Sequence, residues 1–314
     1  MTTPNSTNTV LMVRPANFGF NPETANDNFY QKQDDSKTWG DIQDIATREF
    51  DDFVKLLEEK GVNVVVVHDT NEPAKTDAVF PNNWFSTHED GTLVLYPMAS
   101  PNRRFERRSD ITDVFQNHGF YVKQTIDLTE FECNSQFLEG TGSLVLDRPN
   151  RIVFAGLSVR THMDPITELN KYLNYDLCIF HASQEIKGSH VPIYHTNVMM
   201  HVGTDLAIVC LESINDSAEK HNLKTLLEKA GKHIIPITPE QKFAFAGNML
   251  EVRNQSGEKF TVMSETARDS LTPDQKNTIS KYTSIIAPSI PLIEKLGGGS
   301  ARCMMAEIFL PMKQ

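Results

Sequence analysis

The sequence predicts a single closed α/β domain, residues 1–314, built as a ring of five β-β-α-β units. An amphipathic helix followed at once by a short apolar strand recurs five times, at intervals of about 50 to 65 residues. Paired apolar runs that are typical of β-hairpins lie between these units. One such unit cannot bury both of its faces alone, and closing five units into a ring leaves no exposed end. An ordinary open α/β sheet, or two domains as the length alone suggests, is the alternative.

Each of the five helices is predicted from an apolar stripe near helical spacing, and several end at a glycine. The first runs from Asp41 to Lys60, and Gly61 ends it, because glycine readily adopts the left-handed conformation that follows a helix. Gly119 and Gly231 mark the same step after the second and fourth helices. The predicted helices span residues 41–60, 109–118, 165–175, 216–230 and 273–282, and the strands that follow them span 62–67, 120–122, 177–180, 234–237 and 285–287.

Two hairpins are predicted from facing apolar runs that are joined by turn-forming residues. The first pairs Ser143–Leu146 with Ile152–Phe154, and the second pairs Asn248–Val252 with Phe260–Met263. A last buried strand is expected to run through Ile308, Phe309 and Leu310, close to the end of the chain.

The overall composition narrows the class of protein. A formal net charge of −11 argues against binding to nucleic acid and to anionic membrane surfaces. The first fifteen residues lack the basic and apolar regions of a secretory signal, and no apolar run is long enough to span a bilayer. The four cysteines (Cys133, Cys178, Cys210, Cys303) are scattered, which argues against a zinc site and a disulfide framework, and the usual nucleotide-binding glycine motifs are absent. We therefore expect a cytoplasmic globular protein.

Cys303 follows a run of three glycines, Gly297–Gly299, near the C-terminus. Glycines allow positive φ and let a ligand approach the backbone closely, so the thiol is placed where a nucleophile could act. The plainer interpretation is a small buried hydrophobic side chain, which most free cysteines are. A nucleophilic cysteine also needs a base from elsewhere in the chain.

Two further motifs carry candidate partners for this thiol. Glu139 stands between apolar residues and two glycines, where burial is expected to raise its pKa and suit it to proton transfer; a solvated turn residue is the alternative. His195, Asn197 and Met199 are expected on one face of a strand, so His195 could protonate a leaving amine, although a histidine on a strand is more often structural. His201 lies six residues further on the same face, so the two histidines could also be metal ligands. No carboxylate or cysteine lies close enough in the sequence to complete a typical ligand set, which argues against a metal site.

The segment from Thr76 to Phe85 crowds Asp77, Asn82 and Asn83 around an aromatic-rich turn. One acid and two amides with aromatic walls suit a polar recognition loop. A purely structural turn is the alternative, since Pro-Asn-Asn is favourable turn chemistry.

Taken in chain order, these motifs resemble those of the guanidine-modifying (pentein) superfamily, which includes arginine deiminase, agmatine deiminase, dimethylarginine dimethylaminohydrolase and glycine amidinotransferase. The resemblance covers nearly the whole chain and implies a five-bladed pseudosymmetric α/β propeller. It is closest to the branch named for citrulline-utilisation hydrolases, through Arg14–Asn21, Phe80–Trp84 and Tyr194–Met200. The segments that match the superfamily motifs are Asp77–Asn83 for Asp-x-x-Phe-x-(Glu/Arg)-Asp, Glu139–Gly142 for Glu-Gly-Gly-Asp, Ser158–Thr161 for (Ser/Glu)-x-Arg-Thr, His195–Asn197 for His-x-Asp, and Gly297–Met304 for a glycine-rich run ending in Cys-Met.

The resemblance implies a cysteine-dependent hydrolase that acts on C–N bonds of a citrulline- or arginine-like amino acid. Cys303 would form a covalent intermediate, His195 would protonate the leaving nitrogen and then activate water, and Glu139 would hold the substrate nitrogens. It implies a small-molecule substrate as partner and no metal or organic cofactor, and it leaves a homo-oligomer open. The residues that it assigns to substrate binding are Asp77, Asn82, Asn83, Asn197 and Arg160, the last as partner of the substrate's α-carboxylate.

The chain departs from the superfamily pattern at three acids. Asn83 and Asn197 stand where arginine-processing relatives carry carboxylates, and Gly142 replaces the acid of Glu-Gly-Gly-Asp. Burying a guanidinium needs opposing carboxylates, whereas an Asn amide offers an acceptor and donors, as a neutral ureido group requires. A ureido substrate such as citrulline is therefore favoured. An amidinotransferase, an arginine deiminase or dimethylargininase-type activity, and a binding protein without catalysis are the alternatives.

Overall fold

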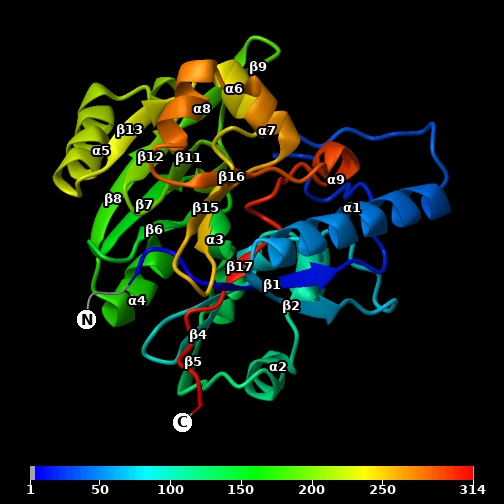
Figure 1. The fold of residues 1–314 in the computed structure, drawn as a ribbon. Helices are drawn as coiled ribbons and strands as arrows, with labels where there is room; N and C mark the ends of the chain where they lie inside the picture. The colour runs from blue at the N-terminus through cyan, green and yellow to red at the C-terminus, as the bar shows by residue number, and fades with distance from the viewer. Residues whose placement is uncertain (1–3, 314) are drawn as a thin grey trace.

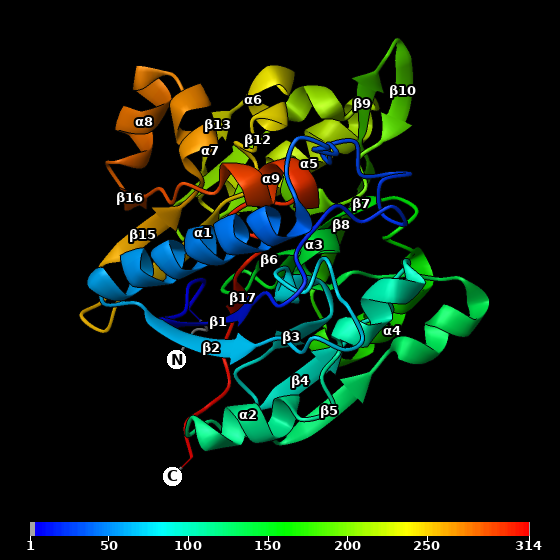
Figure 2. The same ribbon diagram turned by 90° about the vertical axis from the view of Figure 1, so that its right-hand side faces the viewer.

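Residues 4–313, the part of the chain that the computed structural model describes, contain five three-stranded sheets arranged around a common centre (Figure 1 and Figure 2). In every one of these sheets one pair of neighbouring strands is antiparallel and the other pair is parallel. At least one helix connects the two parallel strands, so the predicted β-β-α-β unit is present. The first sheet pairs β1 (Thr9–Arg14) with β17 (Ala306–Glu307), so the two ends of the chain close the ring, and the alternative of an open sheet is wrong.

Each sheet is formed by strands that are consecutive in the chain, except that β17 joins the first sheet. The strands of the sheets are β1, β2 (Asn63–His68) and β17; β3 (Phe85–Thr87), β4 (Thr92–Leu95) and β5 (Gln124–Asp127); β6 (Val145–Asp147), β7 (Ile152–Leu157) and β8 (Asp176–His181); β11 (Met200–Val202), β12 (Leu206–Val209) and β13 (His233–Pro236); and β14 (Leu250–Arg253), β15 (Lys259–Val262) and β16 (Ser284–Ile286). A separate hairpin consists of β9 (Ser183–Ile186) and β10 (Ser189–Pro192). The helices are α1 (Trp39–Glu59), α2 (Ile111–Asn117), α3 (Gly140–Ser143), α4 (Met163–Leu173), α5 (Ser217–Lys229), α6 (Pro239–Phe243), α7 (Glu265–Ser270), α8 (Pro273–Ile279) and α9 (Pro291–Gly297).

Helix α1 shows how the sequence pattern becomes packing. Thr38 accepts a hydrogen bond from the Asp41 N–H and the Asp41 side chain accepts one from the Thr38 N–H, a cap that contributes about 1 kcal/mol. Phe50 and Phe53 on one face are fully buried, and each such side chain removed from water contributes about 1.5–3 kcal/mol. Gly61 adopts a φ of 78° directly after the helix, as predicted, and turns the chain into β2.

The predicted strands that began at Ser143 and Asn248 start two residues later, because those residues lie in the central turns, and two other predicted strands differ more. The strand expected at 120–122 begins only at Gln124, because the residues before it bond to the C-terminal segment around Pro311. The last strand, β17, stops before the expected stretch 308–310, because there the Phe309 N–H donates to the Thr87 hydroxyl instead of to a strand neighbour. The stretch is nevertheless buried, as predicted.

Apolar side chains form four buried clusters between the sheets and the helices that cover them. Among residues 4–313, no helix is long and apolar enough to cross a membrane. Buried polar side chains, including Glu139, Arg160 and Asn197, gather instead at the centre of the ring. The site is therefore built there.

Candidate active site

The centre of the ring is built from five equivalent turns, one before the first strand of each three-stranded sheet. The residues three positions before those strands are Asn82, Gly142, Asn197, Gly247 and Cys303. The turns crowd one another: a Cβ on Gly142 would lie 2.5 Å from Asn83 Nδ2, and a Cβ on Gly247 would lie 2.3 Å from the Val198 carbonyl oxygen. Glycine at two of the five positions therefore leaves room for neighbouring groups.

Hydrogen bonds join neighbouring turns around the ring. Because four contacts link the five turns in succession, residues from distant parts of the chain keep fixed relative positions. The contacts are Thr141 Oγ1 to the Asn82 carbonyl (3.2 Å), Thr196 Oγ1 to the Ser143 carbonyl (2.6 Å), Asn248 Nδ2 to the Asn197 carbonyl (3.2 Å), and the Arg302 N–H to Asn248 Oδ1 (3.1 Å).

Glu139, which precedes α3, is completely buried and forms a 2.8 Å hydrogen bond with His195 Nε2. Arg160 Nη1 lies 3.4 Å and Arg103 Nη1 3.8 Å from the same carboxylate oxygen. Burial acts to raise the pKa of Glu139, but Arg160, His195 and Arg103 outweigh it and hold that pKa below its ordinary value. The predicted rise in the pKa of Glu139 is therefore wrong, and the group is a carboxylate that orients His195.

His195 uses Nε2 for Glu139, which leaves Nδ1 as the acceptor of the neutral ring. Nδ1 and Asn83 Nδ2 both lie close to Gly142, where an added Cβ would be 2.8 Å from the first atom and 2.5 Å from the second. Burial lowers the pKa of His195, Glu139 opposes this, the nearby guanidinium groups add to it, and the net shift is downward. The ring is therefore neutral at rest and free to accept a proton.

The strand predicted through His195 is wrong, because Thr196–Val198 forms a 3₁₀ turn (η4) before β11. The threonine hydroxyl of this turn accepts from the Gly156 N–H and donates to the Ser143 carbonyl, which holds the chain in the turn. Strand alternation consequently does not apply. His195 and Asn197 line two different cavities, instead of sharing one face.

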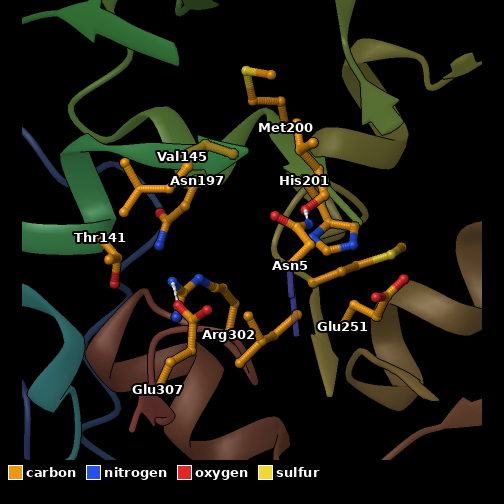
Figure 3. A pocket seen from close by; sticks show the side chains of 13 residues that line it. Asn5, Thr141, Val145, Asn197, Met200, His201, Glu251, Arg302 and Glu307 are labelled. Carbon is orange, nitrogen blue, oxygen red and sulfur yellow. Dashed lines mark hydrogen bonds and ion pairs between the residues drawn. The ribbon is translucent and has the colours of Figure 1, made fainter. Parts of the chain in front are cut away.

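Two small cavities lie at the centre of the ring. The front cavity, of about 20 Å³, is lined by Cys303 and His195 together with Asp77, Asn83, Arg103 and Arg160. The rear cavity, of about 30 Å³, is lined by Asn197, His201 and Arg302 among others (Figure 3). Cavities of this size hold one or two water molecules and not an amino acid. Of the other predicted site residues, Glu139 stands behind His195, and Asn82 lines neither cavity.

Cys303 lies in the last of the central turns and is 5% exposed. Its Sγ accepts hydrogen bonds from Asn248 Nδ2 at 3.2 Å and Asn197 Nδ2 at 3.6 Å. The thiol is therefore held between two amides at the floor of the front cavity.

The glycine run before Cys303 allows close approach, as predicted, but by other parts of the chain. A Cβ on Gly297 or Gly299 would lie 2.7 Å or 2.9 Å from the Phe80 ring. Gly298 has a φ of 63°, and the Asn28 side chain fills the space beside it. The glycines thus bring Phe80 and Asn28 onto the backbone beside the thiol.

The recognition loop predicted around residues 76–85 is buried, and several of its polar atoms have no partner among the described residues. Arg103 Nη1 donates to Asn83 Oδ1 at 3.0 Å, which leaves Asn83 Nδ2 unpaired. Asp77 Oδ2 accepts from Asn21, whereas Asp77 Oδ1 and both amide atoms of Asn82 are unpaired. Burial raises the pKa of Asp77 although Arg103 opposes this. Unpaired buried polar atoms beside a cavity are suited to a ligand.

Arg160 does not face an empty carboxylate site. Its guanidinium forms a two-armed ion pair with Asp27, donates to the Thr24 carbonyl and lies 4.9 Å from the centre of the Tyr194 ring. Together with Glu139 these contacts use four of its five N–H groups. Two-armed pairing of Arg160 with a substrate carboxylate therefore requires Asp27 to move away.

Sequence reasoning missed three residues that shape the site. Arg103 is one of four arginines in the 101–108 stretch and carries no motif, yet it is buried and pairs bidentately with Glu106. Asn248 belongs to a central turn, and only the spacing of that turn from the predicted strand could have marked it. Asp27 lies in a polar segment without a motif.

His201 lines the rear cavity, and its Nε2 has no partner among the described residues (Figure 3). Because His195 lines the other cavity, the two histidines do not form the metal pair that the sequence raised as an alternative. Among residues 4–313 no three His, Cys, Asp or Glu side chains are grouped to hold a metal ion.

Replacing His201 by Gln is expected to make the protein less sensitive to acid. Burial, followed by Arg302 and Lys232, lowers the pKa of His201 to about 3, so below pH 6.5 the unfolded chain takes up a proton that the folded protein refuses. Between pH 7.5 and 4.5 the wild type should lose about 2–3 kcal/mol more unfolding free energy than His201→Gln does. Urea unfolding at both pH values measures this, and equal losses would contradict it.

The family model described as "N,N dimethylarginine dimethylhydrolase, eukaryotic" matches residues 14–310. No curated protein sequence matches the chain significantly.

Solved structures share the fold at low sequence identity. The substrate-bound N-terminal domain of ArgZ, an arginine dihydrolase from the ornithine-ammonia cycle in cyanobacteria, is 15% identical with a TM-score of 0.71, over 95% of this chain and 97% of that one. AgrE with ornithine and NAD⁺ is 18% identical with a TM-score of 0.73, over 98% of this chain but only 40% of that one. A dimethylarginine dimethylaminohydrolase adduct with S-methyl-L-thiocitrulline is 11% identical with a TM-score of 0.64, over 96% and 99%. At these identities the likeness shows the pentein propeller fold alone.

Proposed function

The chain belongs to the N,N-dimethylarginine dimethylhydrolase family, and on that premise we propose that it hydrolyses a neutral ureido amino acid of the citrulline type through Cys303. Membership in this family supports a cysteine-dependent hydrolase acting on C–N bonds. The choice of a ureido over a guanidino substrate rests on one observation, the orientation of the Asn83 amide.

Asn83 presents a hydrogen-bond donor to the front cavity. Arg103 holds its Oδ1, so Nδ2, which has no partner among the described residues, is the free end of an amide that lines the front cavity together with His195. A guanidinium carries only donors, so it would set N–H against N–H here. A ureido group carries a carbonyl oxygen that accepts from Asn83 and N–H groups that donate to Asp77 Oδ1. The donor set thus suits citrulline.

The charges of the site support the same choice. Arg103 lies 3.6 Å from Asp77 and 3.8 Å from Glu139, and Arg160 lies 3.4 Å from Glu139. The chain's own guanidinium groups therefore compensate the two carboxylates that a cationic substrate would need. Two like unit charges about 4 Å apart near a protein surface repel by about 4 kcal/mol, whereas a neutral group avoids this cost.

The proposed reaction uses His195 as base and acid in turn. Cys303 gives its proton to Nδ1, and Sγ bonds to the ureido carbon. The adduct collapses when the imidazolium returns that proton to a leaving nitrogen, which breaks one C–N bond and leaves a thiocarbamate on the enzyme. Water, deprotonated by His195, then attacks this carbon and the C–S bond breaks. After the carbamate loses CO₂, one citrulline and one water have yielded ornithine, ammonia and CO₂.

Substrate entry requires the segment over the front cavity to move. Thr24 and Asn28 from this segment line the cavity, and Asp27 between them occupies Arg160. Because the closed cavity is too small for an amino acid, opening would carry Asp27 away and free the fork of Arg160 for the substrate's α-carboxylate. The Asp27 side chain is 28% exposed, against 2% for Arg160, so the acid is the partner placed to leave.

Arginine is the second candidate substrate, and one atom favours it. Asp77 Oδ1 is a buried, unpaired carboxylate oxygen of a residue that lines the front cavity, and a guanidinium N–H would satisfy it. An amidinotransferase, in which an amine resolves the covalent intermediate, is distinguished by product formation with glycine or ornithine as acceptor.

We expect citrulline to be converted in preference to arginine, and Asn83→Asp to shift the preference toward arginine. The new carboxylate would bind Arg103 with one oxygen and present the other, an acceptor, to the cavity. The ratio of kcat/KM for the two substrates should change on the order of 10- to 100-fold, since an unmatched buried polar group costs about 1–3 kcal/mol. Ammonia and ornithine release, measured side by side for both substrates, tests this.

The control is Asn83→Ala, which removes the donor without adding an acceptor. It should slow citrulline hydrolysis without creating activity on arginine. Conversion of arginine by the wild type with citrulline inert would overturn the proposed substrate.

A further inference from the structure

Two asparagine amides direct N–H groups at the nucleophile from below the front cavity. We propose that Asn248, with Asn197 in support, stabilises the negative charge that forms on Cys303 Sγ when its proton passes to His195, which makes Asn248 a further catalytic residue of the proposed reaction. This inference depends on the proposed function only in taking Cys303 as the nucleophile.

The Asn248 amide has one possible orientation. Its Oδ1 accepts from the Arg302 N–H at 3.1 Å, and its Nδ2 donates to the Asn197 carbonyl and to Cys303 Sγ, each at 3.2 Å. Turning the amide over would place its oxygen against a carbonyl oxygen and its nitrogen against an N–H. The backbone on both sides therefore forces a donor toward the sulfur.

Asn197 supports this arrangement from the rear cavity. Its Nδ2 lies 3.6 Å from Cys303 Sγ, while its Oδ1 has no partner within residues 4–313. Figure 3 shows the Asn197 side chain at the wall of the rear cavity, whose volume of about 30 Å³ is enough for a water that could donate to that oxygen. Asn197 thus lines the rear cavity and donates its N–H toward Cys303 Sγ.

A neutral substrate makes such donors necessary. The guanidinium groups nearest the front cavity are already bound, Arg103 to Glu106 and Arg160 to Asp27, and a ureido group brings no positive charge to the sulfur. When His195 takes the thiol proton, the negative charge on Sγ is met by amide N–H groups. Hydrogen bonds to an ionised acceptor are stronger than neutral ones and favour the charged form.

The test is the pH profile of alkylation at Cys303 by iodoacetamide, with no substrate present. Asn248→Asp keeps an oxygen for the Arg302 N–H and removes the donor to sulfur. We expect the midpoint of the profile to rise by about one to two pH units, the loss of one hydrogen bond to a charged group. Asn248→Ala, which adds no charge, should shift it in the same direction. Normalising each profile to its plateau removes differences in reagent access, and peptide mass spectrometry separates Cys303 from the exposed Cys133.

The matched control is Asn5→Asp, the same change at a buried amide that lines the rear cavity (Figure 3). Asn5 bonds to Val202 and Arg148 and not to the thiol, so its variant should leave the midpoint near the wild-type value. An unchanged midpoint in both Asn248 variants, or an equal shift in Asn5→Asp, would overturn the proposal. A shifted midpoint in a protein inactive on citrulline would refute the substrate and keep the role of Asn248; citrulline turnover with an unshifted midpoint would do the reverse.

Discussion

Replacing Cys303 by Ala is expected to lower kcat for the preferred substrate by several orders of magnitude while the protein stays folded. The proposed reaction has no covalent intermediate without the sulfur, and the remaining site can only position substrate and water. The thiol is buried and accepts from two amides, so its removal should cost about 1–3 kcal/mol of stability, which is less than the 5–15 kcal/mol typical of a folded protein. Ammonia release measures the rate, and intact-protein mass after incubation with citrulline shows an adduct in the wild type alone.

The matched control for this variant is Cys210→Ala. Cys210 is also a fully buried free thiol, but it lies in the apolar cluster beside β12 and outside both cavities. Its replacement should cost about 1 kcal/mol of stability and leave kcat near the wild-type value. Near-normal turnover by Cys303→Ala would rule out the proposed nucleophile.

Replacing Arg160 by Ala is expected to weaken transition-state binding by about 2–5 kcal/mol. This lowers kcat/KM on citrulline roughly 30-fold to several thousand-fold. The proposed cause is the loss of the bidentate partner of the α-carboxylate once Asp27 has moved away. A ureido substrate without the α-carboxylate should lose much less, and the comparison of the two substrates isolates this contact.

Arg160 also compensates the charge of Glu139, so its loss could act through the catalytic groups instead. Arg160→Lys keeps a cation near Glu139 but removes the planar fork, and it should still weaken the carboxylate-bearing substrate. Asp27→Asn removes the competing acid and should lower KM without slowing kcat. If Arg160→Ala reduced activity equally on both substrates, the carboxylate role would be wrong.

Local interactions explain where the sequence predicted the fold well. The apolar stripe of α1 and the facing runs of β6 and β7 depend on neighbours in the chain, and the structure confirms them. The predictions failed where a distant segment competes for the same backbone groups. The C-terminal segment bonds to residues 120–121, and Gly156 and Ser143 hold the turn after His195.

In the candidate site, too, features that depend on short motifs were predicted, and features that depend on distant residues were not. Cys303, His195 and Glu139 could be selected from residue type and glycine context, because those features are written in short motifs. Whether they meet could not be read from the motifs, and the sign of the pKa shift of Glu139 was predicted wrongly. Arg103 and Arg160, which reverse that sign, come from different parts of the chain and carry no local signal for it.

The sequence by itself determined the ring of five units, since periodic apolar patterns and turn residues act over short distances. It also determined the set of chemical groups available, including the asparagines that replace acids. Only the tertiary structure decided which way the Asn83 and Asn248 amides point. That orientation determines whether the front cavity and the thiol face a hydrogen-bond donor or an acceptor. The reason is physical: a buried amide is oriented by whichever donor or acceptor stands opposite it, here Arg103 and Arg302, and the fold alone brings those groups together.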